Sequence, residues 1–355
     1  MSTASELPLD ALERLVERAT GTPPPLRFEE IFGGASVRRF FRVQTRDGGS
    51  VVAMFVPIQS HEFEKKNRNA GRRWPFLEVR DLLAERGVRV PRLIAEACDD
   101  RLILVEDLGE TLAQHLLHSP EDREQLYRMA VRDLSRARRE LAALPADSVV
   151  RERAFDRELL SWELAHFRTW ALDAQGITLD PSEQAAFDRA AEFLISTISE
   201  LPRGFVHRDY QSRNLMVVHE TDGSTSLGWI DFQDALLGPR VYDLVALLGD
   251  SYQSFTPEFV SARLADFSEG LGLSASERPE LEREFALVMV QRKLKDAGRF
   301  VYLDRELGNP NFLRFVGPTI EKAQRALDRL LAEPTLATLS ALLERLFPRT
   351  AQAAR

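Results

Sequence analysis

The chain has 355 residues, enough for two domains or lobes, and 44% hydrophobic with 29% charged residues is an ordinary globular composition. Its net charge of −8 argues against a general nucleic-acid-binding protein, because such proteins carry an excess of positive charge. A single cysteine, Cys98, excludes an intramolecular disulfide framework and a multi-cysteine metal site, which fits a reducing compartment.

The chain begins with an amphipathic helical pattern over residues 1–21, whose mixed charge is not that of a signal peptide. No window approaches the roughly 20 uncharged apolar residues that span a bilayer, so we expect a cytoplasmic protein without a membrane partner. Short β-type runs follow at 38–45, 51–57 and 101–108, with a helical pattern at 74–87 before the last of them. This order predicts a small antiparallel sheet packed by one helix.

After residue 110 the sequence is mostly helical. The first of these helices is expected to start with Ser119 as its N-cap and Pro120 at its first position. We therefore predict two lobes, 1–108 and 109–355; the oligomeric state stays open. Helical patterns cover residues 119–144, 153–171, 181–199, 276–297 and 317–332, and three short apolar runs, 204–206, 215–218 and 226–232, are expected to form a hairpin among them.

Between the first two of these apolar runs stands a polar loop, 207-HRDYQSRN-214. A surface turn does not need both Asp209 and Asn214, and Asp231 ends the last run, so the hairpin can bring three oxygen-bearing side chains together. Asn214 and Asp231 suit Mg²⁺, which prefers oxygen ligands. Asp209 is then the candidate base that accepts a proton from a hydroxyl nucleophile. We assign structural roles to His207 and Arg208.

The spacing of this loop resembles the kinase catalytic loop H-R-D-x-x-x-x-N, and 231-DFQ-233 resembles the magnesium-binding D-F-G element. A protein kinase would continue with a longer activation segment and an A-P-E element, neither of which is present. The shorter 231-DFQDALLGPRVYDLVALLGDSY-252 resembles the aminoglycoside phosphotransferase family over about residues 25–330. This resemblance implies an α+β, bilobal protein-kinase-like fold that uses ATP as co-substrate and Mg²⁺ as cofactor, with the site in the cleft.

Carried over residue by residue, the resemblance implies Asp209 as base, Asn214 and Asp231 as magnesium ligands, and Asp243 as a buried acceptor that steadies the catalytic loop. A narrower likeness adds 36-SVRRFFRV-43, 104-LVEDLGE-110 and 291-QRKLKDAGRF-300 to the loop motifs. Together they are similar to the bacterial anomeric sugar kinases, which use ATP to phosphorylate N-acetylmuramate and N-acetylglucosamine at C1 during cell-wall recycling.

The phosphate-binding side departs from the standard kinase pattern. A kinase strand ending V-A-I-K supplies a lysine to the phosphates, whereas 51-VVAMFVP-57 places Met54 at that position. We expect the positive charge to come from Arg38 or Arg39, or from Lys65 and Lys66. A weak glycine loop, with Gly33, Gly34 and Ser36, is a further ATP-binding candidate. The resemblance also implies adenine contacts through the backbone of Glu106 and Leu108, in the hinge at the lobe boundary.

Sugar recognition requires donors and acceptors for the ring hydroxyls and the amide, and the lactyl carboxylate of N-acetylmuramate favours an arginine or lysine. Candidates by position are Arg213, Gln233, Asp234, Arg292 and Lys295, although charged helix residues are commonly just a solvated face. An aminoglycoside would call for an acidic pocket, which net charge does not decide. Three interpretations stay open: an amino-sugar kinase, a kinase for an aminoglycoside or another small hydroxyl substrate, and a non-catalytic nucleotide-binding scaffold, which Met54 suggests.

Overall fold

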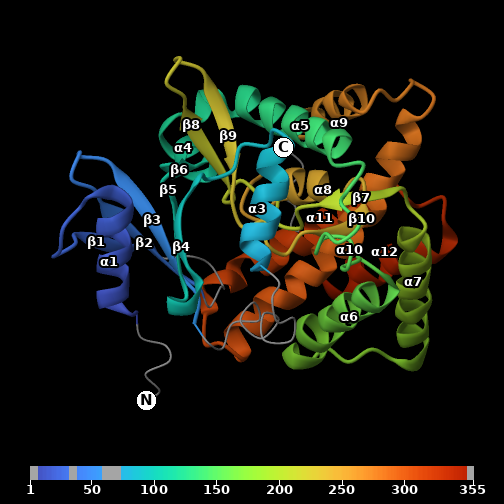
Figure 1. The fold of residues 1–355 in the computed structure, drawn as a ribbon. Helices are drawn as coiled ribbons and strands as arrows, with labels where there is room; N and C mark the ends of the chain where they lie inside the picture. Colours follow the sequence, from blue (N-terminus) through green and yellow to red (C-terminus); the bar gives the residue numbers. More distant parts are fainter. Residues whose placement is uncertain (1–6, 32–37, 58–72, 350–355) are drawn as a thin grey trace. The chain divides into compact units, whose positions relative to one another are not determined.

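The computed structural model describes residues 7–31, 38–57 and 73–349, which form two compact units (Figure 1). Unit 1 comprises Met1–His118 with Arg213–Gln233, and unit 2 comprises Ser119–Ser212 with Asp234–Arg355. This division departs from the predicted boundary at residue 108. The hairpin after the polar loop belongs to unit 1 because strand β6 (Glu110–Thr111) pairs with strand β8 (Leu215–His219).

Unit 1 is built on a five-stranded antiparallel sheet with the strand order β1-β2-β3-β5-β4. The predicted β-type runs form its three inner strands. The two edge strands escape prediction because they are short and largely exposed or half-buried, without a buried apolar face. The strands are β1 (Phe28–Ile31), β2 (Arg39–Gln44), β3 (Ser50–Phe55), β4 (Leu93–Ala97) and β5 (Leu102–Glu106).

Helix α1 (Leu9–Thr20) covers one face of this sheet (Figure 1). Its buried residues Leu12 and Val16 lie one helical turn apart and join a core with Ala53 and Phe55 of β3. Successive strand residues point to opposite faces, so Met54 points away from α1. Helix α3 (Pro75–Glu85) confirms the helix predicted at 74–87.

The second sheet of unit 1 has the order β6-β8-β9, and β6 leads directly into helix α4 (Leu112–His118). Strands β8 and β9 (Thr225–Trp229) form the predicted hairpin. The prediction that 204–206 belongs to the same hairpin is wrong. Those residues lie in β7 (Arg203–Val206), which pairs with β10 (Leu236–Pro239) in unit 2. The prediction failed because the pattern of a short apolar run does not indicate which strand it will pair with.

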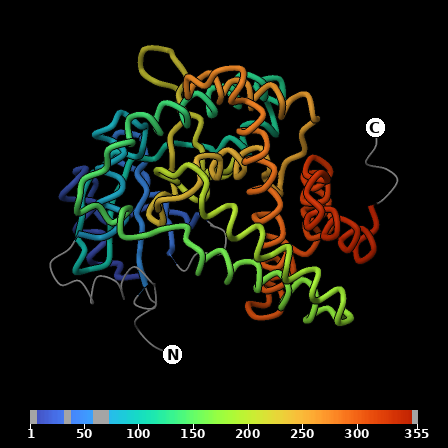
Figure 2. Tube along the Cα trace, turned by 90° about the vertical axis from the view of Figure 1, so that its right-hand side faces the viewer, coloured from blue at the N-terminus to red at the C-terminus, as the bar shows by residue number. Residues whose placement is uncertain are grey.

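Unit 2 is mainly helical. The long α10 is buried over most of its length and runs beside α6 and α11 (Figure 2). The expected N-cap at Ser119 is wrong: Pro120–Asp122 forms a 3₁₀ turn, and Ser119 makes no side-chain cap bond. The helices are α5 (Arg123–Glu140), α6 (Arg157–Phe167), α7 (Pro181–Ser199), α8 (Tyr242–Leu248), α9 (Pro257–Gly270), α10 (Arg278–Arg305), α11 (Val316–Leu327) and α12 (Pro334–Leu346).

Short irregular helical turns complete the structure, and a π-helical turn, Arg168–Leu172, continues α6. The 3₁₀ turns are Cys98–Asp100 in unit 1 and Pro120–Asp122, Asp173–Gln175 and Pro310–Phe315 in unit 2. Within the described parts of the chain, no helix combines the length and the apolar character needed to cross a membrane.

Candidate active site

The first part of the polar loop, His207–Ser212, follows β7 in unit 2 and is anchored by Asp243 of α8. This carboxylate is 2% exposed and accepts hydrogen bonds from the backbone N–H groups of His207, at 2.7 Å, and Arg208, at 2.9 Å. Arg208 has a φ of 81°, in the left-handed region, so the chain is held in a costly conformation where these bonds are made. Burial raises the pKa of Asp243, and the neighbouring His207 opposes that shift.

A second buried carboxylate holds the end of the same loop segment. Asp250, which is fully buried, accepts hydrogen bonds from the Ser212 hydroxyl at 2.6 Å and from the Ser212 N–H at 3.3 Å. Between the two anchors, Tyr210 donates its hydroxyl proton to the carbonyl of Ala130 at 2.9 Å. The sequence analysis missed Asp250, because its role depends on Ser212, 38 residues away in the sequence.

Asp209 is the accessible carboxylate of the segment, with 43% of its side chain exposed. Arg292 of α10 is a buried neighbour of Asp209, with 1% of its side chain exposed. Arg292 Nη2 lies 3.5 Å from Asp209 Oδ1, and Arg292 Nη1 donates a hydrogen bond to the carbonyl of Arg208 at 2.9 Å. Burial lowers the pKa of Arg292, but the neighbouring Tyr242, Asp296 and Asp209 outweigh burial and raise it. A permanent cation therefore faces the candidate base.

The second part of the loop opens strand β8 in unit 1. The β8–β9 ladder pairs Leu215 with Trp229 and is extended by a hydrogen bond of 3.0 Å from Ile230 N–H to the carbonyl of Asn214. Asn214 and Asp231 are therefore held at the same end of the hairpin. Asp231, two residues after the end of β9, has a φ of 64°, in the left-handed region.

The Asp231 carboxylate is 39% exposed and is bound by two unit 1 side chains. Oδ1 accepts hydrogen bonds from Arg38 Nη2 at 2.9 Å and from Gln233 Nε2 at 3.1 Å. A carboxylate and a carboxamide at one end of a hairpin fit the oxygen donors that Mg²⁺ prefers. Gln233, which we predicted as a substrate contact, is 2% exposed and orients this carboxylate.

The predicted phosphate-binding residues differ from the lysine that a standard kinase strand supplies. Met54 is fully buried in β3, and its thioether side chain carries no charge. Arg39 is bound to Glu30 by two hydrogen bonds of 2.8 and 2.9 Å. Arg38 is the candidate whose guanidinium touches a predicted magnesium ligand. The other predicted phosphate-binding residues, Gly33, Gly34, Ser36, Lys65 and Lys66, lie outside the described residues.

Both predicted hinge residues make close side-chain contacts within unit 1. Burial raises the pKa of Glu106, but the two hydrogen bonds of 2.9 Å that it accepts from Arg89, with its other contacts, outweigh burial and lower it. Leu108 is 7% exposed and lies tightly against Gly228, where an added Cβ would come within 2.5 Å of Leu108 Cδ1. The glycine lets the hairpin approach the hinge closely.

The remaining predicted substrate contacts have different surroundings. Arg213 is exposed and Asp234 is half-buried. Lys295 of α10 is largely buried, with 18% of its side chain exposed, and its Nζ lies 2.9 Å from Asp296 Oδ1. Burial lowers the pKa of Lys295, but Asp296 and its other acidic neighbours raise it overall, so this lysine is charged.

An aromatic group in unit 2 escaped the sequence analysis. Trp162 and His166 are one turn apart on α6; the rings stack with centroids 5.1 Å apart, and Trp162 is 57% exposed. On α10, the Arg299 guanidinium lies 4.8 Å from the ring of Tyr302, which in turn contacts His166 at 5.4 Å. Burial, with Arg299 and Lys295 nearby, lowers the pKa of His166 to about 4. Aromatic residues at i and i+8, Trp162 and Trp170, with His166 between them, were the available signal.

The fold and these motifs define the class of protein. The Phosphotransferase enzyme family matches residues 27–283, and the chain belongs to this family. Choline kinase LicA from Streptococcus pneumoniae aligns with a TM-score of 0.57 at 14% identity, covering 91% of this chain and 99% of that one. The ADP-bound aminoglycoside phosphotransferase APH(2'')-Ib aligns with a TM-score of 0.56 at 15% identity, covering 89% and 98%. The predicted α+β, kinase-like fold is confirmed.

Curated relatives are more similar in sequence. The chain is 32% identical over 346 residues to the N-acetylmuramate/N-acetylglucosamine kinase of Pseudomonas aeruginosa, covering 96% of this chain and 94% of the relative. The protein of the same name from Neisseria meningitidis is 30% identical over 327 residues, covering 90% and 91%. The predicted resemblance to this branch of the family is thereby confirmed.

Proposed function

We propose that the protein is an ATP-dependent kinase that phosphorylates the C1 hydroxyl of N-acetylmuramate or N-acetylglucosamine, giving the sugar 1-phosphate in cell-wall recycling in the cytoplasm. The observation that carries the proposal is the anchored loop: Asp243 and Asp250 hold its backbone while Asp209 stays accessible and faces Arg292. The names of the curated relatives support the choice of sugar.

In the proposed reaction the sugar oxygen attacks the γ-phosphorus of ATP, the bond from that phosphorus to the ADP oxygen breaks, and Asp209 accepts the hydroxyl proton. Arg292 orients Asp209 for this transfer. Asn214 and Asp231 would hold Mg²⁺, which neutralises charge on the phosphates when bound. Arg38, beside Asp231, is the proposed replacement for the kinase lysine missing at Met54.

The arrangement of α10 supports a location for the sugar. Arg292 supports Asp209, and Lys295, Arg299 and Tyr302 follow at intervals of three or four residues, which places them along one side of the helix. We assign the lactyl carboxylate to Lys295 and Arg299, because charge-assisted hydrogen bonds select anionic groups. The exposed face of Trp162 offers an apolar surface to a sugar ring. Arg213 and Asp234 stay proposed substrate contacts.

The experiment that tests the function measures ATP consumption with a panel of amino sugars and aminoglycosides and identifies the product position by phosphorus NMR. We expect turnover with N-acetylmuramate or N-acetylglucosamine that falls by about 10²–10⁴-fold in Asp209→Ala. The exposed Asp188 of α7 supplies the matched control, Asp188→Ala, which should keep full activity. Turnover with aminoglycosides alone would support the other kinase, and nucleotide binding without any transfer would support the scaffold.

The proposed carboxylate contact has its own measurement. Arg299→Gln should raise KM for N-acetylmuramate about tenfold relative to KM for N-acetylglucosamine, because only the first sugar carries the lactyl group. Arg305→Gln, on the exposed last turn of the same helix, is the control. An equal change in both KM values would show that Arg299 does not recognise the lactyl carboxylate. The proposed role of Asp209 would not be affected by that result.

A further inference from the structure

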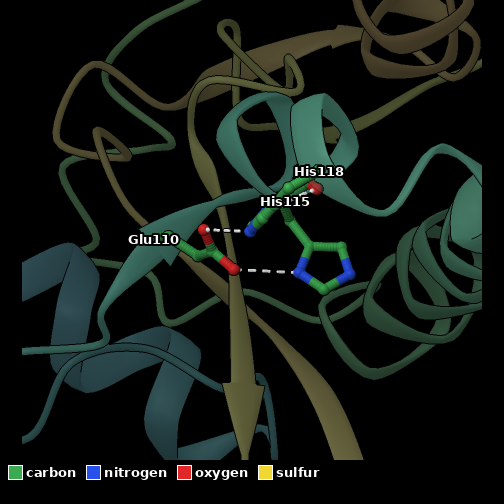
Figure 3. A group of neighbouring side chains, drawn as sticks. All are labelled: Glu110, His115 and His118. Carbon is green, nitrogen blue, oxygen red and sulfur yellow. Dashed lines mark hydrogen bonds and ion pairs between the residues drawn. The ribbon is translucent and has the colours of Figure 1, made fainter.

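A group of three potential metal ligands lies in unit 1, apart from the predicted magnesium ligands in the sequence. Glu110 ends the hinge on β6, and His115 and His118 are three residues apart on α4, so they share one side of the helix. Figure 3 shows the Glu110 carboxylate facing both imidazole rings. One ligand atom from each residue lies within 4.8 Å of the other two.

The contacts of His118 leave one of its ring nitrogens facing a carboxylate oxygen. Its Nδ1 lies 3.1 Å from the carbonyl oxygen of His115, and a carbonyl only accepts, so Nδ1 carries a proton. The other ring nitrogen, Nε2, lies 3.2 Å from a Glu110 carboxylate oxygen. In a neutral ring that nitrogen is a lone-pair acceptor facing an anion. A metal cation bound by both atoms makes this approach of a lone pair to a carboxylate favourable.

The surroundings suit a metal ion. His115 Nδ1 lies 2.9 Å from the other Glu110 oxygen, and both distances are close to the edge of about 3.3 Å that a tetrahedral zinc site has between ligand atoms. The bond from His118 Nδ1 to a backbone carbonyl fixes the tautomer that presents Nε2 to a metal. The side chains of Glu110 and His118 are 39% and 54% exposed, which leaves an entry path and room for a water ligand.

We propose that Glu110, His115 and His118 bind a divalent transition-metal ion of the Zn²⁺ class, independently of the magnesium position. Two imidazoles and one carboxylate favour such borderline ions over Mg²⁺, which prefers oxygen ligands alone. The ion joins β6 to α4. Glu110 pairs with Val217 of β8, the strand that follows Asn214, so bound metal stabilises the base of the hairpin that carries the predicted magnesium ligands.

The test uses the full chain, freed of metal by a chelator, and measures Zn²⁺ binding by calorimetry near neutral pH in excess Mg²⁺ without nucleotide. We expect one Zn²⁺ per chain and an affinity at least tenfold lower in Glu110→Gln and in His118→Gln. His219→Gln is the matched control, because His219 is an exposed histidine of β8 in the same unit and lies outside the group. Its affinity should equal that of the unchanged protein.

Two further readouts keep the proposal falsifiable. Co²⁺ in place of Zn²⁺ should give the visible absorption bands of a four-coordinate site, which the His118→Gln variant lacks, and Zn²⁺ should raise the thermal midpoint in the unchanged protein. Far-UV circular dichroism checks that both variants remain folded. Absence of one-to-one binding would overturn the proposal. Binding that the group's variants and His219→Gln affect equally would overturn it as well. Kinase activity does not enter these measurements.

Discussion

The two parts of the polar loop are held in different ways. Buried side-chain carboxylates anchor His207–Ser212 in unit 2, through contacts 36 and 38 residues away in sequence. Backbone pairing of the β8–β9 hairpin holds Asn214 and Asp231 in unit 1. A single substitution can therefore remove an anchor from the first part, whereas the second part has a ladder of bonds that share the task. The candidate base depends on long-range contacts, and the predicted magnesium ligands depend on a local one.

The largest expected effect comes from Asp243→Ala. It leaves the N–H groups of His207 and Arg208 buried without their carboxylate, which should lower the free energy of unfolding by about 4 kcal/mol and remove most activity. Urea unfolding and turnover are the measurements. Asp188→Ala, which removes an exposed acceptor in the same unit, should change stability by under about 0.5 kcal/mol. Equal losses in the two variants would show that Asp243 is no anchor.

Ser212→Ala tests the other anchor and should cost about 2 kcal/mol, because its hydroxyl donates to a buried carboxylate at 2.6 Å. The backbone bond from Ser212 N–H remains, so the loss is smaller than that of Asp243→Ala. Urea unfolding again measures it. Ser196→Ala, on an exposed face of α7, is the control. A cost no greater than that of the control would mean that Asp250 is satisfied without the hydroxyl.

Gly228→Ala probes the hairpin part. The new Cβ meets Leu108 Cδ1 at 2.5 Å, which the end of a leucine side chain can relieve by moving, so we expect a loss of about 1 kcal/mol. Ser196→Ala, on the exposed face of α7, is again the control and should change stability by under about 0.5 kcal/mol. Thermal unfolding compares the two. If Gly228→Ala were more stable than the unchanged protein, the β8–β9 hairpin would lie further from Leu108 than in this structure.

The smallest effect at neutral pH concerns His166. Its pKa is about 4 in the folded protein against an ordinary 6.5, so between these values the unfolded chain binds a proton that the folded chain does not. The contribution of neutral His166 to the free energy of unfolding is therefore fully present above pH 6.5, and it falls as the pH drops towards 4. His166→Gln should reduce the dependence of the free energy of unfolding on pH by the amount that corresponds to up to one bound proton, as measured by urea unfolding across pH 4–7. His219→Gln, an exposed histidine of unit 1, should leave the slope unchanged.

The local parts of the fold follow from the pattern of the sequence. Helix α7 has the predicted bounds because Asp180 forms a capping box ahead of Pro181, a signal that lies entirely within the helix's first turn. The β8–β9 hairpin likewise follows from two apolar runs and a turn-rich connection. The partner of β7 and the role of Asp250 could not be predicted in the same way, because both depend on residues 30 to 38 positions away.

The sequence by itself determined the chemistry that this protein offers: a base-bearing loop, oxygen donors at set spacings and a methionine where the kinase lysine stands, since these are matters of residue type and order. Tertiary structure alone decided which group supports which. It set Arg292 against Asp209, Arg38 against Asp231, and Glu110 between two histidines. Such pairs form where separate elements pack, and the energy that selects them is that of burying charges with partners, which no local pattern records.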